Sequence, residues 1–220
     1  LNIALLLLLS STSLLAAPRG DVLYEKNCSA CHGLDGSGGV GVPLSLPSFQ
    51  ASVDDLFLFQ SIRHGRPGRV MPAFIDLGDA QINAIVKHLR SLAPAIKPIK
   101  FDNQRVIQGD IANGKQLYAD NCAQCHGARG EGGHGTGVTF SRPRDLPIIA
   151  PALNNSGFLA AASDELIHYT ITHGRRGTPM QAFGRKGQNE REINDIVSYI
   201  RSFEQAEHWS PIAVDEATIM

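Results

Sequence analysis

The sequence predicts an all-α fold made of two tandem domains of related design, and three observations support this prediction. Three blocks of sequence occur twice in the same order, which indicates a duplicated unit. Both copies of the last block place apolar residues at intervals of three, one and three, the spacing of one helix face. Alternating patterns typical of strands are almost absent. Each unit should therefore be a small bundle of helices.

The repeated blocks keep their order and differ only in the lengths between them. The three matches are 20–33 with 114–127 ("GDVLYEKNCSACHG" and "GKQLYADNCAQCHG", an offset of 94), 64–74 with 173–183 ("HGRPGRVMPAF" and "HGRRGTPMQAF", an offset of 109), and 82–92 with 193–203 ("INAIVKHLRSL" and "INDIVSYIRSF", an offset of 111). Three ordered matches exclude chance similarity, so the chain contains a duplicated domain.

Each unit should contain three helices. A short helix leads into the first block, with Leu23 and Tyr24 on its apolar side in the first unit. A middle helix is expected within 53–65 and 162–174, where an aspartate stands near the start and a glycine at the end. The last helix carries the apolar face described above. Glycine-rich stretches follow the first block in both units and are too flexible for regular structure.

The repeats and a segment with two prolines set the expected domain boundaries. We expect a first domain at 18–95, a linker at 96–108 that runs extended over the surface, a second domain at 109–206 and a tail at 207–220. Hydrophobic residues make up 43% of the chain and charged residues 19%, which excludes a disordered or multiply membrane-spanning protein. The net charge of -1 gives no reason to expect a nucleic-acid partner.

The first seventeen residues, 1–17, carry no charge and run apolar from Ile3 to Leu9. This pattern is typical of a signal peptide. A retained N-terminal anchor is the alternative, at the short limit for crossing a bilayer. Either interpretation puts the remaining chain outside the cytoplasm, in the periplasm, with membrane contact only through this segment if it is not cleaved.

All four cysteines of the chain lie in two matched pairs, and a histidine follows each pair directly. A disulfide framework would scatter its cysteines, and a zinc site of four thiolates would not need both histidines. A thioredoxin-like motif expects a strand before it, which is missing. CxxCH is the signature of covalent haem c attachment. We therefore expect two haem c groups, bound by Cys28, Cys31, Cys122 and Cys125, with His32 and His126 as proximal iron ligands.

The second axial ligand should be a methionine in each unit. Met71 and Met180 occupy matched positions, each followed two residues later by Ala-Phe, in loops rather than on an apolar helix face. The rival pair is His64 and His173, matched at a probable helix end, where capping or a bond to a haem propionate is the alternative use. Axial methionine raises the reduction potential and closes the iron to small ligands. Two closed irons indicate electron transfer.

Four further residues are candidates for supporting each haem. The carbonyl of Pro47 or Pro151 could accept a hydrogen bond from the proximal imidazole and fix its orientation. A plain turn proline is the alternative use of both. Arg66 and Arg175 could offset propionate charge through bidentate contacts, or could be solvated loop residues.

Through "CSACHG", "CAQCHG" and the two methionine blocks, the chain resembles the class I cytochromes c, in particular their two-domain dihaem members. The resemblance covers roughly 20–92 and 114–203. It implies tandem cytochrome c domains, each a small helical bundle around one covalent haem, with first and last helices crossing near it. It also implies a role as a periplasmic electron shuttle or as the haem subunit of a respiratory or dehydrogenase complex. The leading interpretation is a carrier that turns over no substrate and passes electrons from a dehydrogenase or quinol-oxidising donor to an oxidase or reductase.

Two alternatives stay open beside the free carrier. One is a dihaem enzyme, either a peroxidase or a sulfur-compound oxidoreductase, which would need an iron with a displaceable ligand. Matched Met71 and Met180 argue against it. The other is an anchored haem subunit of a larger redox complex, held by residues 1–17.

Overall fold

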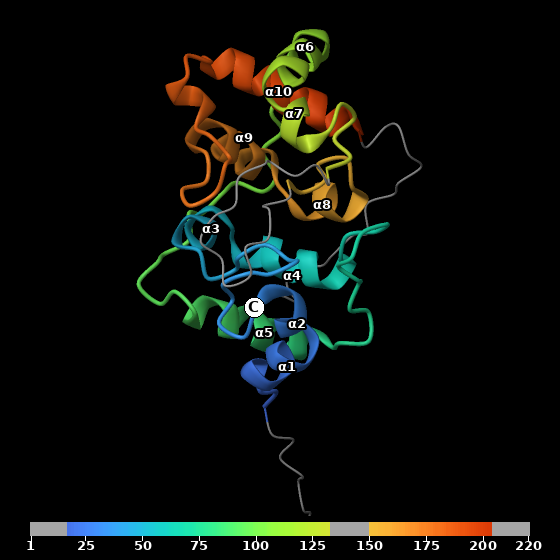
Figure 1. The fold of residues 1–220 in the computed structure, drawn as a ribbon, viewed down its shortest axis with the longest axis vertical. Helices are drawn as coiled ribbons and strands as arrows, with labels where there is room; N and C mark the ends of the chain where they lie inside the picture. The colour runs from blue at the N-terminus through green and yellow to red at the C-terminus, as the bar shows by residue number, and fades with distance from the viewer. Residues whose placement is uncertain (1–16, 133–149, 204–220) are drawn as a thin grey trace, which may run out of the picture.

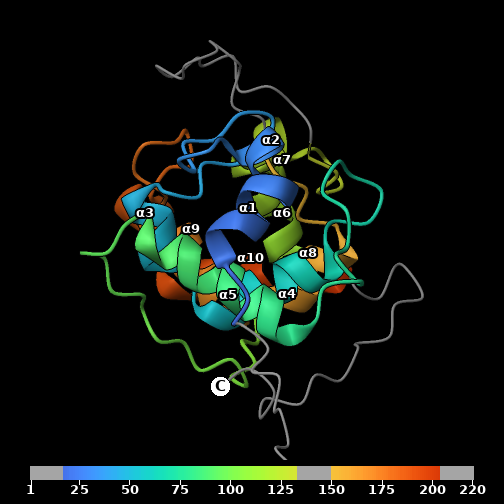
Figure 2. The same cartoon turned by 90° about the horizontal axis from the view of Figure 1, so that it is seen from below.

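A computed structural model of the chain describes residues 17–132 and 150–203. Within these ranges every regular element is a helix, as predicted (Figure 1). The helices of the first domain are α1 (Gly20–Asn27), α2 (Ser29–His32), α3 (Pro47–Ser52), α4 (Asp55–His64) and α5 (Asp79–Ser91). Those of the second are α6 (Ile111–Asn121), α7 (Ala123–His126), α8 (Ser156–Ala161), α9 (Asp164–His173), the 3-10 turn η1 (Phe183–Arg185) and α10 (Glu190–Ser202). The two domains stack along the long axis of the molecule (Figures 1 and 2).

The first and last helices of each domain cross at a glycine. A side chain at Gly20 would lie 1.8 Å from the carbonyl oxygen of Ala84 in α5, and one at Gly114 would lie 1.9 Å from that of Asp195 in α10. Only glycine permits so close an approach of two backbones. The crossing of α1 with α5, and of α6 with α10, follows the arrangement that the resemblance implied.

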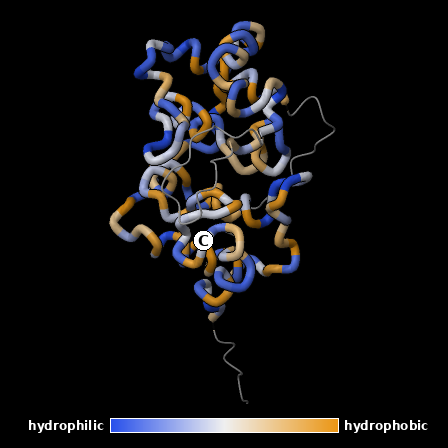
Figure 3. The backbone as a smooth tube through the Cα atoms, in the orientation of Figure 1, coloured by the Kyte–Doolittle hydropathy of each residue, from blue (hydrophilic) through white to orange (hydrophobic). Residues whose placement is uncertain are grey.

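The predicted apolar faces form the core. Ile82, Ile85, Val86 and Leu89 of α5 are all buried, as are their counterparts in α10. Hydrophobic and hydrophilic residues intermix along the backbone of both domains (Figure 3). In the first helix of each domain, Tyr24 and Tyr118 are only 1% exposed. Their hydroxyls donate hydrogen bonds to the carbonyls of Gly33 and Gly127. These two bonds tie the first helix to the loop that follows each cysteine pair.

An ion pair joins the middle and last helices in both domains. Arg90 lies 2.7 Å from Asp55, and Arg201 lies 2.5 Å from Asp164. The aspartates differ in exposure: the side chain of Asp55 is 63% exposed and that of Asp164 only 10%. The same contact is therefore a surface pair in the first domain and a buried pair in the second.

The segment between the domains, 96–108, forms no helix or strand, and it is bonded to both of them. Ile99 donates its N–H to the carbonyl of Ala51 in the first domain. Ile107 is 8% exposed and donates its N–H to Asp164 in the second. The N–H of Asp110 then bonds to Asp195 of α10, which fixes the start of α6.

Candidate functional site

Each cysteine pair lies on a single helical turn that continues the first helix of its domain. Cys28 ends α1, and the N–H of His32 bonds to its carbonyl at 3.0 Å, while Cys122 and His126 repeat this contact at 2.9 Å. None of the four cysteines forms a disulfide. Burial raises the pKa of Cys28 to about 11 and that of Cys122 to about 12, and the neighbouring cysteine adds to both shifts. Both thiols are therefore protonated near neutral pH.

Both histidines of the motifs are held by a backbone carbonyl. The Nδ1 atom of His32 lies 2.8 Å from the carbonyl oxygen of Val42, and that of His126 lies 2.9 Å from the oxygen of Pro151. A carbonyl can only accept, so Nδ1 carries the proton and Nε2 keeps its lone pair. Burial lowers the pKa of both rings, and the carbonyl bond opposes that shift. Each imidazole is thus neutral, oriented and able to act as a metal ligand.

The carbonyl of Pro151 lies where the second-domain prediction put it, but the prediction for Pro47 was wrong. Pro47 begins α3, a position where proline loses no helical hydrogen bond, and the bond to His32 comes from Val42. Pro47 and Pro151 stand 104 residues apart, whereas Val42 and Pro151 stand 109 apart, the offset of the next repeated block. Carrying that offset back through the loop would have identified Val42.

The two methionines lie on equivalent loops that follow α4 and α9. The N–H of Arg66 bonds to the carbonyl of Met71 at 2.9 Å, and that of Arg175 bonds to Met180 at 2.9 Å. Each loop starts at a glycine with positive φ, 61° at Gly65 and 65° at Gly174, where the chain turns away from the helix. Both methionine side chains are partly buried, and Met180 packs against the core.

The rival histidines are engaged elsewhere. Nε2 of His64 lies 2.7 Å from the side-chain oxygen of Gln60, one turn earlier on α4. His173 packs its ring 4.3 Å from that of Tyr169 on α9. Both are the last residues of their helices, where their partners hold them on the helix.

Comparison with known proteins connects this geometry to a family. The family model described as "Cytochrome C oxidase, cbb3-type, subunit III" matches residues 15–89 and 109–200. The chain belongs to this family. It therefore contains two cytochrome c domains, and its two CxxCH motifs are haem c attachment sites.

Curated relatives of this cytochrome include oxidase subunits and a dehydrogenase. It is 26% identical over 204 residues to the "Cbb3-type cytochrome c oxidase subunit CcoP" of Azospirillum sp. (strain B510), covering 83% of this chain and 60% of that protein. It is 26% identical over 191 residues to a "Thiosulfate dehydrogenase" of Psychrobacter arcticus, covering 80% of this chain and 55% of the relative. The chain thus spans 60% or less of the length of these two relatives.

A solved structure shares the fold. The cytochrome aligns with a chain of the "Kuenenia stuttgartiensis reducing HAO-like protein complex Kustc0457/Kustc0458" at a TM-score of 0.52 and 22% identity, covering 84% of this chain and 95% of that one. Among residues 17–132 and 150–203, no helix is long and apolar enough to cross a membrane. Residues 1–16, most of the predicted signal peptide or anchor, and the tail from 204 lie outside the described residues.

The residues of the cytochrome fit a haem c in both domains. The thiols are free for thioether bonds, and each imidazole presents Nε2 while a carbonyl holds Nδ1. Gly41 leaves room for the first imidazole, since a side chain there would lie 2.7 Å from the ring of His32. A bound haem c supplies a one-electron iron couple at this place. The cysteine pairs attach it, and the carbonyls of Val42 and Pro151 orient the imidazoles of His32 and His126.

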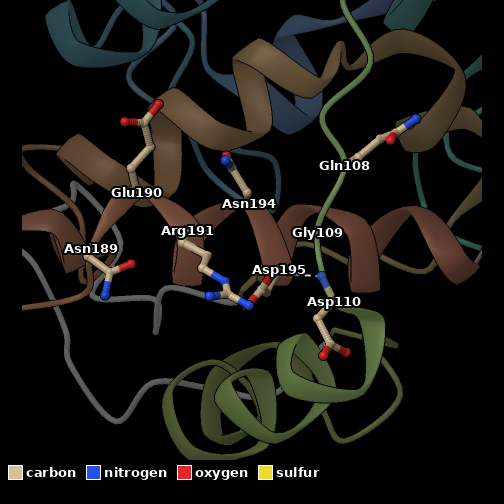
Figure 4. A pocket seen from close by; sticks show the side chains of 8 residues that line it. All are labelled: Gln108, Gly109, Asp110, Asn189, Glu190, Arg191, Asn194 and Asp195. Atoms are coloured by element: carbon tan, nitrogen blue, oxygen red, sulfur yellow. Dashed lines mark hydrogen bonds between the residues drawn. The ribbon is translucent and has the colours of Figure 1, made fainter.

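One pocket of the cytochrome lies apart from these residues (Figure 4). It is formed where the linker meets the start of α10, and its lining is polar: Gln108, Gly109, Asp110, Asn189, Glu190, Arg191, Asn194 and Asp195. It contains none of the predicted site residues. Two of its residues, Asp110 and Asp195, are already bonded to each other through the N–H of Asp110.

Proposed function

We propose that the chain is a dihaem electron-transfer protein that acts as the haem-carrying part of a respiratory redox complex on the exported side of the membrane. The observation that carries the proposal is the duplication of one complete arrangement. Each domain has a cysteine pair, a carbonyl-oriented histidine and a loop methionine at equivalent places. The oxidase subunits among the relatives favour a place in a complex over a freely diffusing carrier.

The chain's own residues would do three things in this function. Cys28, Cys31, Cys122 and Cys125 hold the haems covalently, so that the groups cannot dissociate. His32 and His126 provide the proximal ligands with fixed orientation. Met71 and Met180 provide the distal ligands, which close both irons and raise their potentials. Partners would be redox proteins, a quinol-oxidising or dehydrogenase donor and an oxidase or reductase acceptor.

The test is spectroscopy of the full chain produced with haem attachment. We expect two haems per chain, both low-spin, with the absorption of a sulfur ligand in the oxidised state. Met71→Leu and Met180→Leu should each remove about half of that band, because each leaves one haem intact. A control, Val70→Ala beside Met71, should remove none. A high-spin haem in the unmodified protein, or rapid binding of carbon monoxide, would contradict two closed irons.

A second candidate function is oxidation of a sulfur compound, which the thiosulfate dehydrogenase relative favours. Adding thiosulfate to the oxidised protein distinguishes the two. An electron-transfer subunit leaves both haems oxidised in the absence of its donor, whereas a thiosulfate dehydrogenase reduces them. We expect no reduction, because both methionines occupy the positions that a substrate would have to displace.

A further inference from the structure

The interface between the two domains is nearly symmetric. The loop after α4 contacts α8 of the second domain, and the loop after α9 contacts α3 of the first, as the stacked helices show (Figure 1). Asn155 donates its side-chain amide to the carbonyl of Pro67 at 2.8 Å, and Ser48 donates its hydroxyl to the carbonyl of Arg176 at 2.6 Å. Pro67 and Arg176 are equivalent, 109 residues apart. The loop that carries Met71 and the loop that carries Met180, the two methionine loops, therefore each bind the other domain.

Arg66 crosses this interface from the first domain. Its guanidinium donates to the carbonyl of Gly157 in α8 at 3.2 Å, to its neighbour Gly65 at 2.7 Å and to the hydroxyl of Ser61 at 2.8 Å. It also lies 5.8 Å from the ring centre of Phe57. All of these partners are neutral.

Arg175, its counterpart, crosses in the opposite direction. Its guanidinium carbon lies 5.1 Å from the ring centre of Phe49, in α3 of the first domain. Its own backbone N–H bonds to Met180, as that of Arg66 bonds to Met71. In each domain, therefore, an arginine of the methionine loop contacts the other domain.

Neither arginine has a carboxylate partner among the described residues. The ion pairs within those residues use other arginines: Arg19, Arg63, Arg90, Arg105 and Arg201. Burial lowers the pKa of Arg66 and of Arg175 to about 10, and no acidic neighbour opposes the shift. Both side chains still keep their charge near neutral pH, so within the described residues two cations lie at the interface without an acidic partner.

Each arginine contacts the other domain at a residue that follows, in the sequence, the carbonyl that holds that domain's histidine. Gly157, the acceptor of Arg66, is six residues after Pro151, whose carbonyl holds His126. Phe49, the ring under Arg175, is seven residues after Val42, whose carbonyl holds His32. Each arginine, on its own domain's methionine loop, therefore contacts the chain segment that follows the histidine-orienting carbonyl of the other domain.

We propose that Arg66 and Arg175 each raise the reduction potentials of both haems, and not only the potential of the haem in their own domain. This inference rests on the proposed function, because it requires two haems. Reduction adds a negative charge to each haem, and a nearby cation stabilises that state. A half-buried cation acts over a longer range than a fully exposed one, since screening by water and ions is weaker there.

The experiment is a redox titration of the haem-loaded full chain, followed by NMR so that each haem gives its own signals. Arg66→Gln removes the charge and keeps a hydrogen-bonding side chain. We expect both haems to become harder to reduce, each by on the order of tenfold in its oxidised-to-reduced ratio, or ~59 mV for a one-electron couple. Arg175→Gln should do the same. Arg66→Lys keeps the charge and should restore most of the shift.

Arg176→Gln is the matched control, because Arg176 is an exposed neighbour on the same loop. It should move neither potential by more than a small fraction of the Arg66→Gln shift. A shift confined to the variant's own domain would overturn the proposal in favour of a local role. Unchanged potentials in both variants, with two haems present, would show a purely structural role. Fewer than two haems in the unmodified chain would instead contradict the proposed function.

Discussion

The two domains close the same hydrogen bond with loops of different length. In the first domain ten residues separate His32 from the carbonyl of Val42, and in the second 25 separate His126 from that of Pro151. The distances agree, at 2.8 and 2.9 Å. The carbonyl is therefore delivered by the part of the loop that leads into α3 or α8, and the preceding residues are free to vary. The length of the loop therefore does not locate the carbonyl that holds the histidine, whereas the position of the carbonyl relative to the following helix does.

The largest expected difference between the domains concerns the buried and the surface ion pair. Asp164→Asn removes the carboxylate from a pair in which its side chain is 10% exposed, and should cost about 3–5 kcal/mol of unfolding free energy. Asp55→Asn, at 63% exposure, should cost about 0–1 kcal/mol. Urea unfolding of the haem-loaded chain measures both. Equal losses would mean that the two pairs are energetically alike despite their burial.

The domain interface gives an intermediate effect. A side chain at Gly157 would lie 2.3 Å from the carbonyl oxygen of Gly65, so Gly157→Ala should push α8 away and cost roughly 1–3 kcal/mol. Ser48 holds the equivalent position and donates to Arg176, so Ser48→Ala should cost about 0.5–1.5 kcal/mol. Thermal unfolding compares the two. If Gly157→Ala leaves the stability unchanged, the two domains can move apart without a loss of unfolding free energy.

The smallest expected effect concerns the histidines of the two CxxCH motifs. Gly41 and Ala150 are equivalent, and only the first leaves no room for a side chain, since one would lie 2.7 Å from the His32 ring. Gly41→Ala should displace that ring, cost roughly 1 kcal/mol and change the absorption of one haem. Ala150→Gly is the control and should leave both haem spectra unchanged. Identical spectra in both variants would mean that the first loop adjusts freely.

The sequence predicted the fold class, the repeat and the cysteine–histidine motifs because each follows from local pattern. The faces of α5 and α10 are read from their spacing, and the ends of α4 and α9 from their glycines. The short helices α3 and α8 were not predicted, since six residues are too few to show a period. Val42 was missed because the two prolines were paired at an offset of 104, whereas the residue equivalent to Pro151 at the repeat offset of 109 is Val42. The interface partners of Arg66 and Arg175 depend on how two domains pack, which no repeat in one chain specifies.

The linker changes what counts as a folding unit in this chain. Its N–H groups bond to Ala51 at one end and to Asp164 near the other, and Ile107 is buried in the second domain. The N–H of Asp102 bonds to Glu165 of the second domain, whereas the side chain of Asn103 bonds to Asp54 of the first, so a cut between the domains would remove contacts from at least one of them. A duplication supplied two similar modules, yet their connection has become part of the packing of both. The pair, rather than the single module, is now the smallest piece that keeps all of its contacts.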